Sequence, residues 1–133
     1  MPESAHPGRR DEERGVSVNI YHIWFNLKPG IGDLELSDRL GAYLDRLKEQ
    51  GLIAAWRLTR RKLGLAPREF GDFHAMIEIS DLSQLDRAFD HVATRGEPVE
   101  ELHFAVNSLV SDATFALYRD FPDPVRRRGE EKF

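Results

Sequence analysis

The sequence predicts an α+β fold, in which helices cover one face of a four-stranded antiparallel sheet. A chain of 133 residues, 41% of them hydrophobic and 32% charged, has the size and composition of one globular domain. Stretches with strand-like and helical spacing of apolar residues follow one another in the order β-α-β-β-α-β. The first strand-like stretch is apolar on both faces, which is typical of a strand in the middle of a sheet.

The central strand is predicted over residues 16–27, VSVNIYHIWFNL, which are rich in β-branched and aromatic side chains. A half-exposed strand alternates apolar with polar residues, and this stretch hardly does. One alternate set of its residues is Tyr21, Ile23, Phe25 and Leu27. The other set mixes large apolar with polar side chains and includes Ile20, His22, Trp24 and Asn26. We therefore expect both faces of this strand to be covered.

The first helix is predicted after a loop at residues 28–32, with Asp33 or Ser37 as its N-cap and Gly51 at its end. Its apolar positions recur at helical spacing and form one stripe, made of Leu36, Leu40, Tyr43, Leu44 and Leu47.

A second helix is predicted from Asp81, with Gln84 in the position of a capping box and Gly96 at its end. Its apolar stripe consists of Leu82, Leu85, Phe89 and Val92. Pro98 fits the first turn of a further short helix. The apolar positions of that helix are Val99, Leu102, Val106 and Leu109.

The remaining strands are predicted over residues 52–63, 70–80 and 114–121. The second and third strands are expected to form a hairpin because the connection between them is short. Pro122 prevents the fourth strand from continuing in a ladder. The order β-α-β-β-α-β, with an extra short helix before the last strand, is the ferredoxin-like pattern.

We expect a flexible leader at residues 1–15, one domain at residues 16–123 and a charged tail at residues 124–133. The net charge of −4 argues against nucleic acid and membranes as partners. The absence of cysteine excludes disulfides and thiol chemistry, and it fits the cytoplasm. No apolar run approaches the ~20 residues of a membrane helix, and we expect no secretory signal because the first residues contain no apolar stretch.

Strand parity sorts the residues of the sheet into two faces. The set expected to face the helices is apolar throughout and consists of Ile23, Phe25, Leu58, Ala75, Ile77, Phe115 and Leu117. The opposite set consists of Ile20, His22, Trp24, Asn26, Ala55, Arg57, Thr59, His74, Met76, Glu78, Ala116 and Tyr118. An exposed patch that carries Ile20, Trp24 and Met76 marks an interaction site, and the same face of a second copy would cover it. Two sheets paired in this way form a dimeric α/β barrel, with the polar members lining a pocket.

Two segments carry a resemblance to a known family. The segment at residues 103–121, HFAVNSLVSDATFALYRDF, and the opening YHIWFNLKPG resemble the end and the beginning of stress-responsive dimeric α/β-barrel (Dabb) proteins. The resemblance covers residues 16–123 and is to an uncharacterised bacterial branch. It implies a homodimer and no single activity, because members range from enzymes to proteins with no assigned role.

The candidate catalytic residues are His22, His74 and Tyr118, which parity places on the barrel-facing side of the sheet. A histidine titrates near neutral pH, so beside a tyrosine it can do acid–base work on a phenol or enol. Polyketide cyclases with a similar barrel use a His/Tyr pair. The candidate ligand-pocket residues are Trp24, Asn26, Arg57, Met76 and Glu78. The structural alternative is that these groups satisfy one another by hydrogen bonds inside a dimer interface.

Two cofactor hypotheses are weaker. His22, His74 and Glu78 are residue types that bind zinc or iron, but no compact ligand motif supports a metal site. A second set invites comparison with haem-degrading monooxygenases of a similar barrel, namely Asn19, Trp24, Asn26, Trp56 and His103. Packing and capping roles explain that set as well, and we predict neither a metal nor another cofactor.

The outer half of the second strand and the loop after it carry a basic run, which comprises Arg57, Arg60, Arg61, Lys62 and Arg68. It could hold an anion, but charged edge strands commonly block edge-to-edge aggregation, and we favour that role for all but Arg57.

The favoured hypothesis is a cytoplasmic, stress-responsive homodimer with a pocket for a small ligand, including aromatic molecules. The alternatives are a small enzyme, either polyketide-cyclase-like or monooxygenase-like, and a purely structural dimer with a filled interior.

Overall fold

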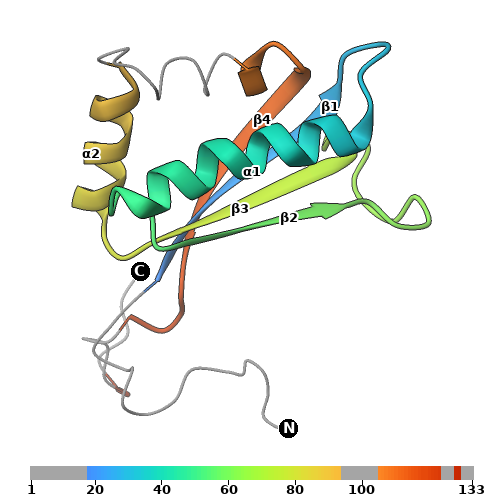
Figure 1. The fold of residues 1–133 in the computed structure, drawn as a ribbon. Coiled ribbons are helices and arrows are strands. Elements are labelled where there is room, and N and C mark those ends of the chain that lie inside the picture. Colours follow the sequence, from blue (N-terminus) through green and yellow to red (C-terminus); the bar gives the residue numbers. More distant parts are fainter. Residues whose placement is uncertain (1–17, 94–104, 124–127, 130–133) are drawn as a thin grey trace, which may run out of the picture.

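The computed structural model describes residues 18–93, 105–123 and 128–129 (Figure 1). Its elements are β1 (Asn19–Leu27), α1 (Asp33–Glu49), β2 (Ala55–Arg60), β3 (Phe73–Ile79), α2 (Leu82–Ala93) and β4 (Val110–Arg119). The four strands form one sheet in the order β2-β3-β1-β4, and all neighbours are antiparallel. The predictions of a ferredoxin-like α+β fold, a central first strand and a β2–β3 hairpin are therefore confirmed.

Helix α1 crosses the sheet and supplies much of the core (Figure 1). Four leucines of its predicted stripe are buried, and they pack with strand residues such as Phe25, Ala75 and Ile77. The predicted N-cap is wrong, because Gly32 occupies that position and no side chain caps the helix. Asp33 is instead the first residue of the helix, where its negative charge interacts favourably with the helix dipole. Gly51 ends the helix as predicted, with a positive φ of 74°.

Helix α2 is tied to the end of α1 by Gln84, which is only 8% exposed. The backbone N–H of Gln84 donates to Oδ1 of Asp81 at 2.8 Å, as in the predicted capping box. The side-chain Oε1 accepts from the backbone N–H of Ser80 at 2.7 Å, one residue earlier than that motif requires. Its Nε2 donates to the carbonyl of Gly51 at 2.9 Å. One side chain therefore fixes the start of α2 against the α1–β2 turn.

The predicted apolar stripe of α2 is only partly buried. Leu85 packs against the core and Ala88 is buried, whereas Leu82 and Phe89 are about half exposed. Phe89 meets the ring edge of Tyr21 with 5.6 Å between centroids. Helix α2 thus covers its part of the sheet more loosely than α1 does.

The observed strand bounds differ from the predicted ones, most of all in β2 and β4. Strand β2 is limited to six residues, and β4 begins at Val110, four residues earlier than predicted. The register between β1 and β4 shifts between Trp24 and Asn26, and Asp112 has a positive φ of 57°. Because of this irregularity, the first residues of β4 do not follow the regular alternation of the two faces. The alternation of side chains along the sequence therefore did not locate the start of the strand.

Some predictions fall on residues outside the described ones. They are the leader at residues 1–15, most of the tail at 124–133, the helix end at Gly96, the helix start at Pro98, and His103. Within the described stretch that follows, residues 105–107 are helical, and Val106 and Leu109 are buried as expected. No helix in the described part of the chain is long and apolar enough to cross a membrane.

Candidate functional site

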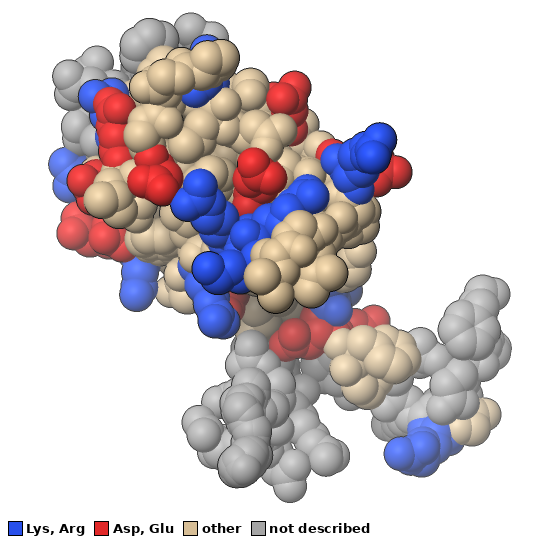
Figure 2. All heavy atoms as spheres, turned by 90° about the vertical axis from the view of Figure 1, so that its right-hand side faces the viewer, with Lys and Arg blue, Asp and Glu red and all other residues tan. Residues whose placement is uncertain are grey.

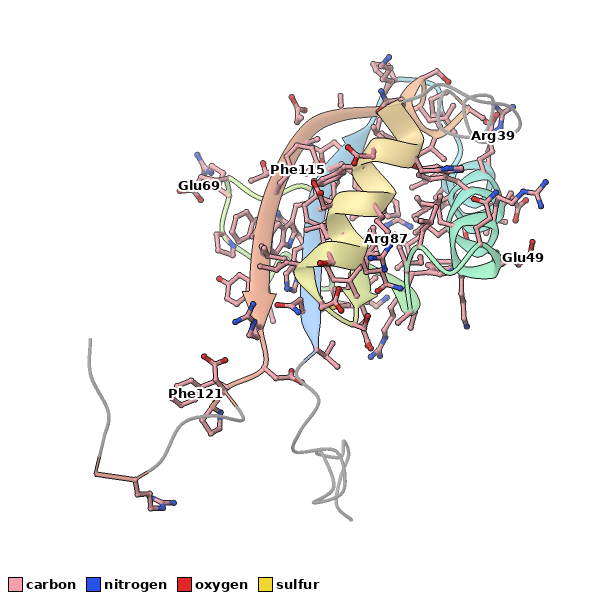
Figure 3. All side chains as sticks on the ribbon, turned by 90° about the vertical axis from the view of Figure 1, so that its left-hand side faces the viewer. Arg39, Glu49, Glu69, Arg87, Phe115 and Phe121 are labelled. Atoms are coloured by element: carbon pink, nitrogen blue, oxygen red, sulfur yellow. The ribbon has the colours of Figure 1, made fainter. Side chains whose placement is uncertain are left out.

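The face of the sheet turned away from α1 and α2 carries the predicted site residues, and we call it the open face. Cross-strand pairing arranges it in three rows: Tyr118–Ile20–Glu78–Ala55, Ala116–His22–Met76–Arg57 and Thr114–Trp24–His74–Thr59. This register confirms the predicted sorting of residues by parity. In the described part of the chain, both helices lie on the other side of the sheet (Figure 3). The open-face side chains are accordingly half-buried or exposed, whereas Phe25, Phe73 and Ile79 on the helix side are buried.

The two histidines of the open face form a hydrogen-bonded pair. Nδ1 of His22 lies 2.8 Å from Nε2 of His74. The register makes the two residues diagonal neighbours, because His22 is opposite Met76 and His74 is opposite Trp24. One ring must donate and the other accept, so the pair shares a single proton at this contact. Partial burial lowers the pKa of His22, and burial followed by the charge of His22 lowers the pKa of His74.

Aromatic rings extend this pair across the face. Trp24 stacks with both Phe70 and His74, with 4.4 Å between ring centroids in each pair. Tyr118 meets His22 edge-on at 5.0 Å. We call these five residues the ring cluster. The structure therefore brings together the three candidate catalytic residues and Trp24, with Tyr118 joined to the two histidines through its ring contact with His22.

Sequence analysis did not single out Phe70 as a member of this cluster. It lies just before β3, in the loop that follows β2, where the alternation of a strand no longer applies. Its parity matches that of His74, and this was the only available signal.

The other candidate pocket residues are less uniform. Met76 lies opposite His22 at the centre of the face, Glu78 lies beside Ile20, and Arg57 is exposed on β2. Asn26 lies one row beyond Trp24 and is held by two contacts. Its Oδ1 accepts from the backbone N–H of Asp72 at 2.9 Å, and its Nδ2 donates to Oδ2 of Asp112 at 3.3 Å. Asn26 thus links three strand ends.

The residues compared with haem enzymes are divided between the two faces. Nε1 of Trp56 donates to Oδ1 of Asp45 on α1 at 2.7 Å. Asn19 is buried on the helix side and accepts from Nε of Arg119 at 2.8 Å. Trp24 and Asn26 lie on the open face, and His103 is not among the described residues. Among the described residues, no group of three or more His, Cys, Asp or Glu side chains could hold a metal ion.

Two arginines of the basic run have partners within the protein. Arg60 pairs with Asp33 at 2.9 Å and lies over the ring of Phe73. Arg61 donates to backbone carbonyls of the loop that follows β2. Figure 2 shows Lys and Arg side chains gathered on the side of the molecule that carries the loop after β2, with acidic side chains among them. The strand register places Arg57, opposite Met76, on the open face.

A cavity of about 240 Å³ lies on the helix side, between α2, α1 and the sheet. Its walls are mostly apolar and include Tyr21, Leu40, Tyr43, Leu85, Phe89 and Phe115. Phe115 lies on β4 beside α2 (Figure 3). Burial raises the pKa of Tyr43 to about 12. The sequence analysis missed this cavity, because it depends on how closely α2 packs on the sheet.

Comparison with known proteins assigns the chain to a family. The family of unknown function DUF6614 matches residues 18–133. The chain belongs to this family. The comparison with curated proteins found no match. Because the function of the DUF6614 family is unknown, the activity of this protein has to be inferred from its site.

Solved structures share the fold of this DUF6614 protein. SnoaB from Streptomyces nogalater, a cofactor-independent oxygenase, has 13% identity and a TM-score of 0.56 over 77% of this chain and 90% of that one. At3g17210 from Arabidopsis thaliana has 7% identity and a TM-score of 0.57 over 80% of this chain and 88% of that one. A dabb family protein with a ferredoxin-like fold from Mesorhizobium loti has 16% identity and a TM-score of 0.51, over 80% and 97% of the two chains. At these identities the likeness concerns the fold.

Proposed function

We propose that this DUF6614 protein is a homodimer in which two open faces pack together and enclose the ring cluster in a pocket for a small ligand. The support is the character of the open face. Ile20, Trp24 and Met76 are only half-buried there, and in the described part of the chain no helix covers them. A two-fold axis needs one self-complementary patch, and this face supplies it.

The ligand class follows from the chemistry of the ring cluster. Stacked rings of Phe70, Trp24 and His74 favour a planar aromatic molecule. The observation that carries the proposal is the His22–His74 contact of 2.8 Å. Because the two rings share one proton there, their outer nitrogens present one donor and one acceptor. A phenol or enol satisfies both, and it could exchange its proton with the pair.

The dimer is tested by light scattering, which should give twice the chain mass of 15.3 kDa. The pocket is tested with 4-nitrophenol, whose absorption changes when it loses its proton. We expect a saturable change with the wild type, its loss in His22→Asn and His74→Gln, and its retention in His91→Gln on α2. A non-saturable change that is equal in all four proteins would refute the pocket and favour a structural dimer with a filled interior.

A second candidate binding site is favoured by the apolar cavity beneath α2. At about 240 Å³ it is large enough for a small apolar molecule. Ala88 is buried in its wall, so Ala88→Leu should reduce uptake of an apolar probe such as naphthalene without changing the response to 4-nitrophenol. Equal uptake of the apolar probe by both proteins would exclude this site.

The resemblance to Dabb proteins extends the proposal to a stress-responsive role in the bacterial cytoplasm. It is tested by following the abundance and location of the protein in its host under heat, acid and oxidative challenge. An unchanged abundance under all three would remove this part of the proposal and leave the dimer and its pocket intact.

A further inference from the structure

The loop between β2 and β3, residues 61–72, carries two of the most exposed large apolar side chains of the described chain. Leu63 is 90% exposed and Leu65 is 78% exposed. Figure 1 shows this β2–β3 loop extending beyond the body of the sheet. In Figure 3, Glu69 of the same loop lies on the side of the sheet away from α1. The loop therefore projects past the sheet on the side of the open face.

Arg61 fixes the base of the β2–β3 loop. Its backbone N–H donates to the carbonyl of Asp72 at 2.7 Å, which closes the loop. Its Nη2 donates to the carbonyl of Pro67 at 3.2 Å and to the carbonyl of Phe70. One guanidinium thus gathers several backbone acceptors, so the loop has a defined shape.

The returning arm of the loop is attached to the open face. A Cβ atom added at Gly71 would lie 2.3 Å from the backbone of Phe25, so the loop runs directly against β1. This close approach sets the ring of Phe70 on Trp24, with 4.4 Å between centroids. The loop and the ring cluster are therefore one continuous surface.

The backbone at the tip of the loop has an uncommon conformation, and the leucine side chains there are exposed. Leu63 has a φ of 55° and Gly64 a φ of 68°, so two consecutive residues adopt positive φ. Positive φ is unfavourable for leucine. A loop that only connects two strands would carry polar residues at its tip. The strained, exposed Leu63 and the exposed Leu65 lie beside the open face, and such side chains indicate a contact with another molecule.

We propose that the β2–β3 loop is a dimer arm, whose Leu63 and Leu65 pack against the partner subunit at the margin of the paired open faces. The inference rests on the proposed homodimer and adds the partner's loop to the wall of each pocket. One observation favours a second copy as the occupant. Through Phe70 the loop is continuous with the open face that the proposed homodimer pairs.

Sedimentation equilibrium tests the arm with the double variant Leu63→Ser/Leu65→Ser. Leu34 on α1 is 76% exposed and faces away from the sheet's open side, so Leu34→Ser is the matched control. The dimer dissociation constant should rise by about tenfold or more in the double variant, because buried leucine surface is lost. It should be unchanged in the control. A monomeric wild type refutes the homodimer itself, whereas a dimeric wild type with equal constants in both variants refutes only the arm.

A second measurement uses the absence of cysteine from the chain. Leu65→Cys and Leu34→Cys each provide a single site for an environment-sensitive maleimide dye. As the protein concentration passes through the dissociation constant, emission from position 65 should shift to shorter wavelength and emission from position 34 should not. Equal behaviour of the two positions in a dimeric protein would overturn the proposal.

Discussion

His22 and His74 hold one hydrogen bond between adjacent strands, with 2.8 Å between Nδ1 of the first and Nε2 of the second. This contact exists only while at least one ring is neutral. When both rings are protonated, two positive charges face each other at that distance. The pair therefore makes the open face sensitive to acid.

Stability should fall as the pH drops below about 6.5, the ordinary pKa of histidine. Burial lowers the pKa of both histidines in the folded protein, so the unfolded chain binds more protons in this range. Stability is therefore full above that pH and declines as the pH falls toward the lowered values. Thermal unfolding between pH 5 and 8 measures this slope for the wild type. His74→Gln should have a shallower slope, and an unchanged slope in that variant would contradict the assignment.

Replacing Gln84 by alanine should cost about 2 kcal/mol or more, because it removes the acceptor of the Ser80 N–H and the donor to Gly51 at a buried site. Urea unfolding measures the loss. Gln50→Ala at the exposed end of α1 is the control and should change the free energy of unfolding by less than about 0.5 kcal/mol. Similar losses in the two variants would show that Gln84 does not hold α2.

Gly71→Ala should destabilise the protein by about 2–4 kcal/mol, since the new Cβ would meet the backbone of Phe25. Because the loop must move, the indole N–H resonance of Trp24 should shift as Phe70 leaves its ring. At Gly41 an added Cβ would make only an ordinary contact with the Trp56 ring at 3.6 Å, and Gly41→Ala is therefore the control. A stable Gly71→Ala protein with an unmoved Trp24 resonance would show that the close approach is not required.

Asn26→Ala should reduce stability by about 1–2 kcal/mol, because the Asp72 N–H and the Asp112 carboxylate lose their partner. The response to 4-nitrophenol should persist, since Asn26 is engaged by the protein and lies one row beyond Trp24. Unfolding in urea and absorption titration separate the two effects. Loss of the titration signal in a well-folded variant would show that Asn26 lines the pocket, as predicted from the sequence.

Sequence reasoning predicted the sheet because its evidence was strong and local. The apolar character of both faces of β1 required a central position, and the two-residue period assigned His22, Trp24 and His74 to one face before any contact was known. Strand pairing then had only a few arrangements available. The relation between the two histidines followed from parity, but their hydrogen bond depended on a diagonal register that composition does not specify.

The features that were missed depend on non-local geometry. The irregular pairing near Asp112 and the stacking of Phe70 on Trp24 both arise from how chain segments meet in space. The loose packing of Phe89 has the same origin, because a helical stripe shows which side faces inward and not how closely it packs.

The two tryptophans of the chain lie on opposite sides of the sheet, Trp24 within the ring cluster and Trp56 against α1. The fluorescence of each tryptophan therefore reports on a different face of the sheet. In Trp56→Phe the emission would come only from the face proposed to meet a partner, whereas in Trp24→Phe it would come only from the helix layer. Quenching by iodide in these two proteins could follow the opening of one side without interference from the other.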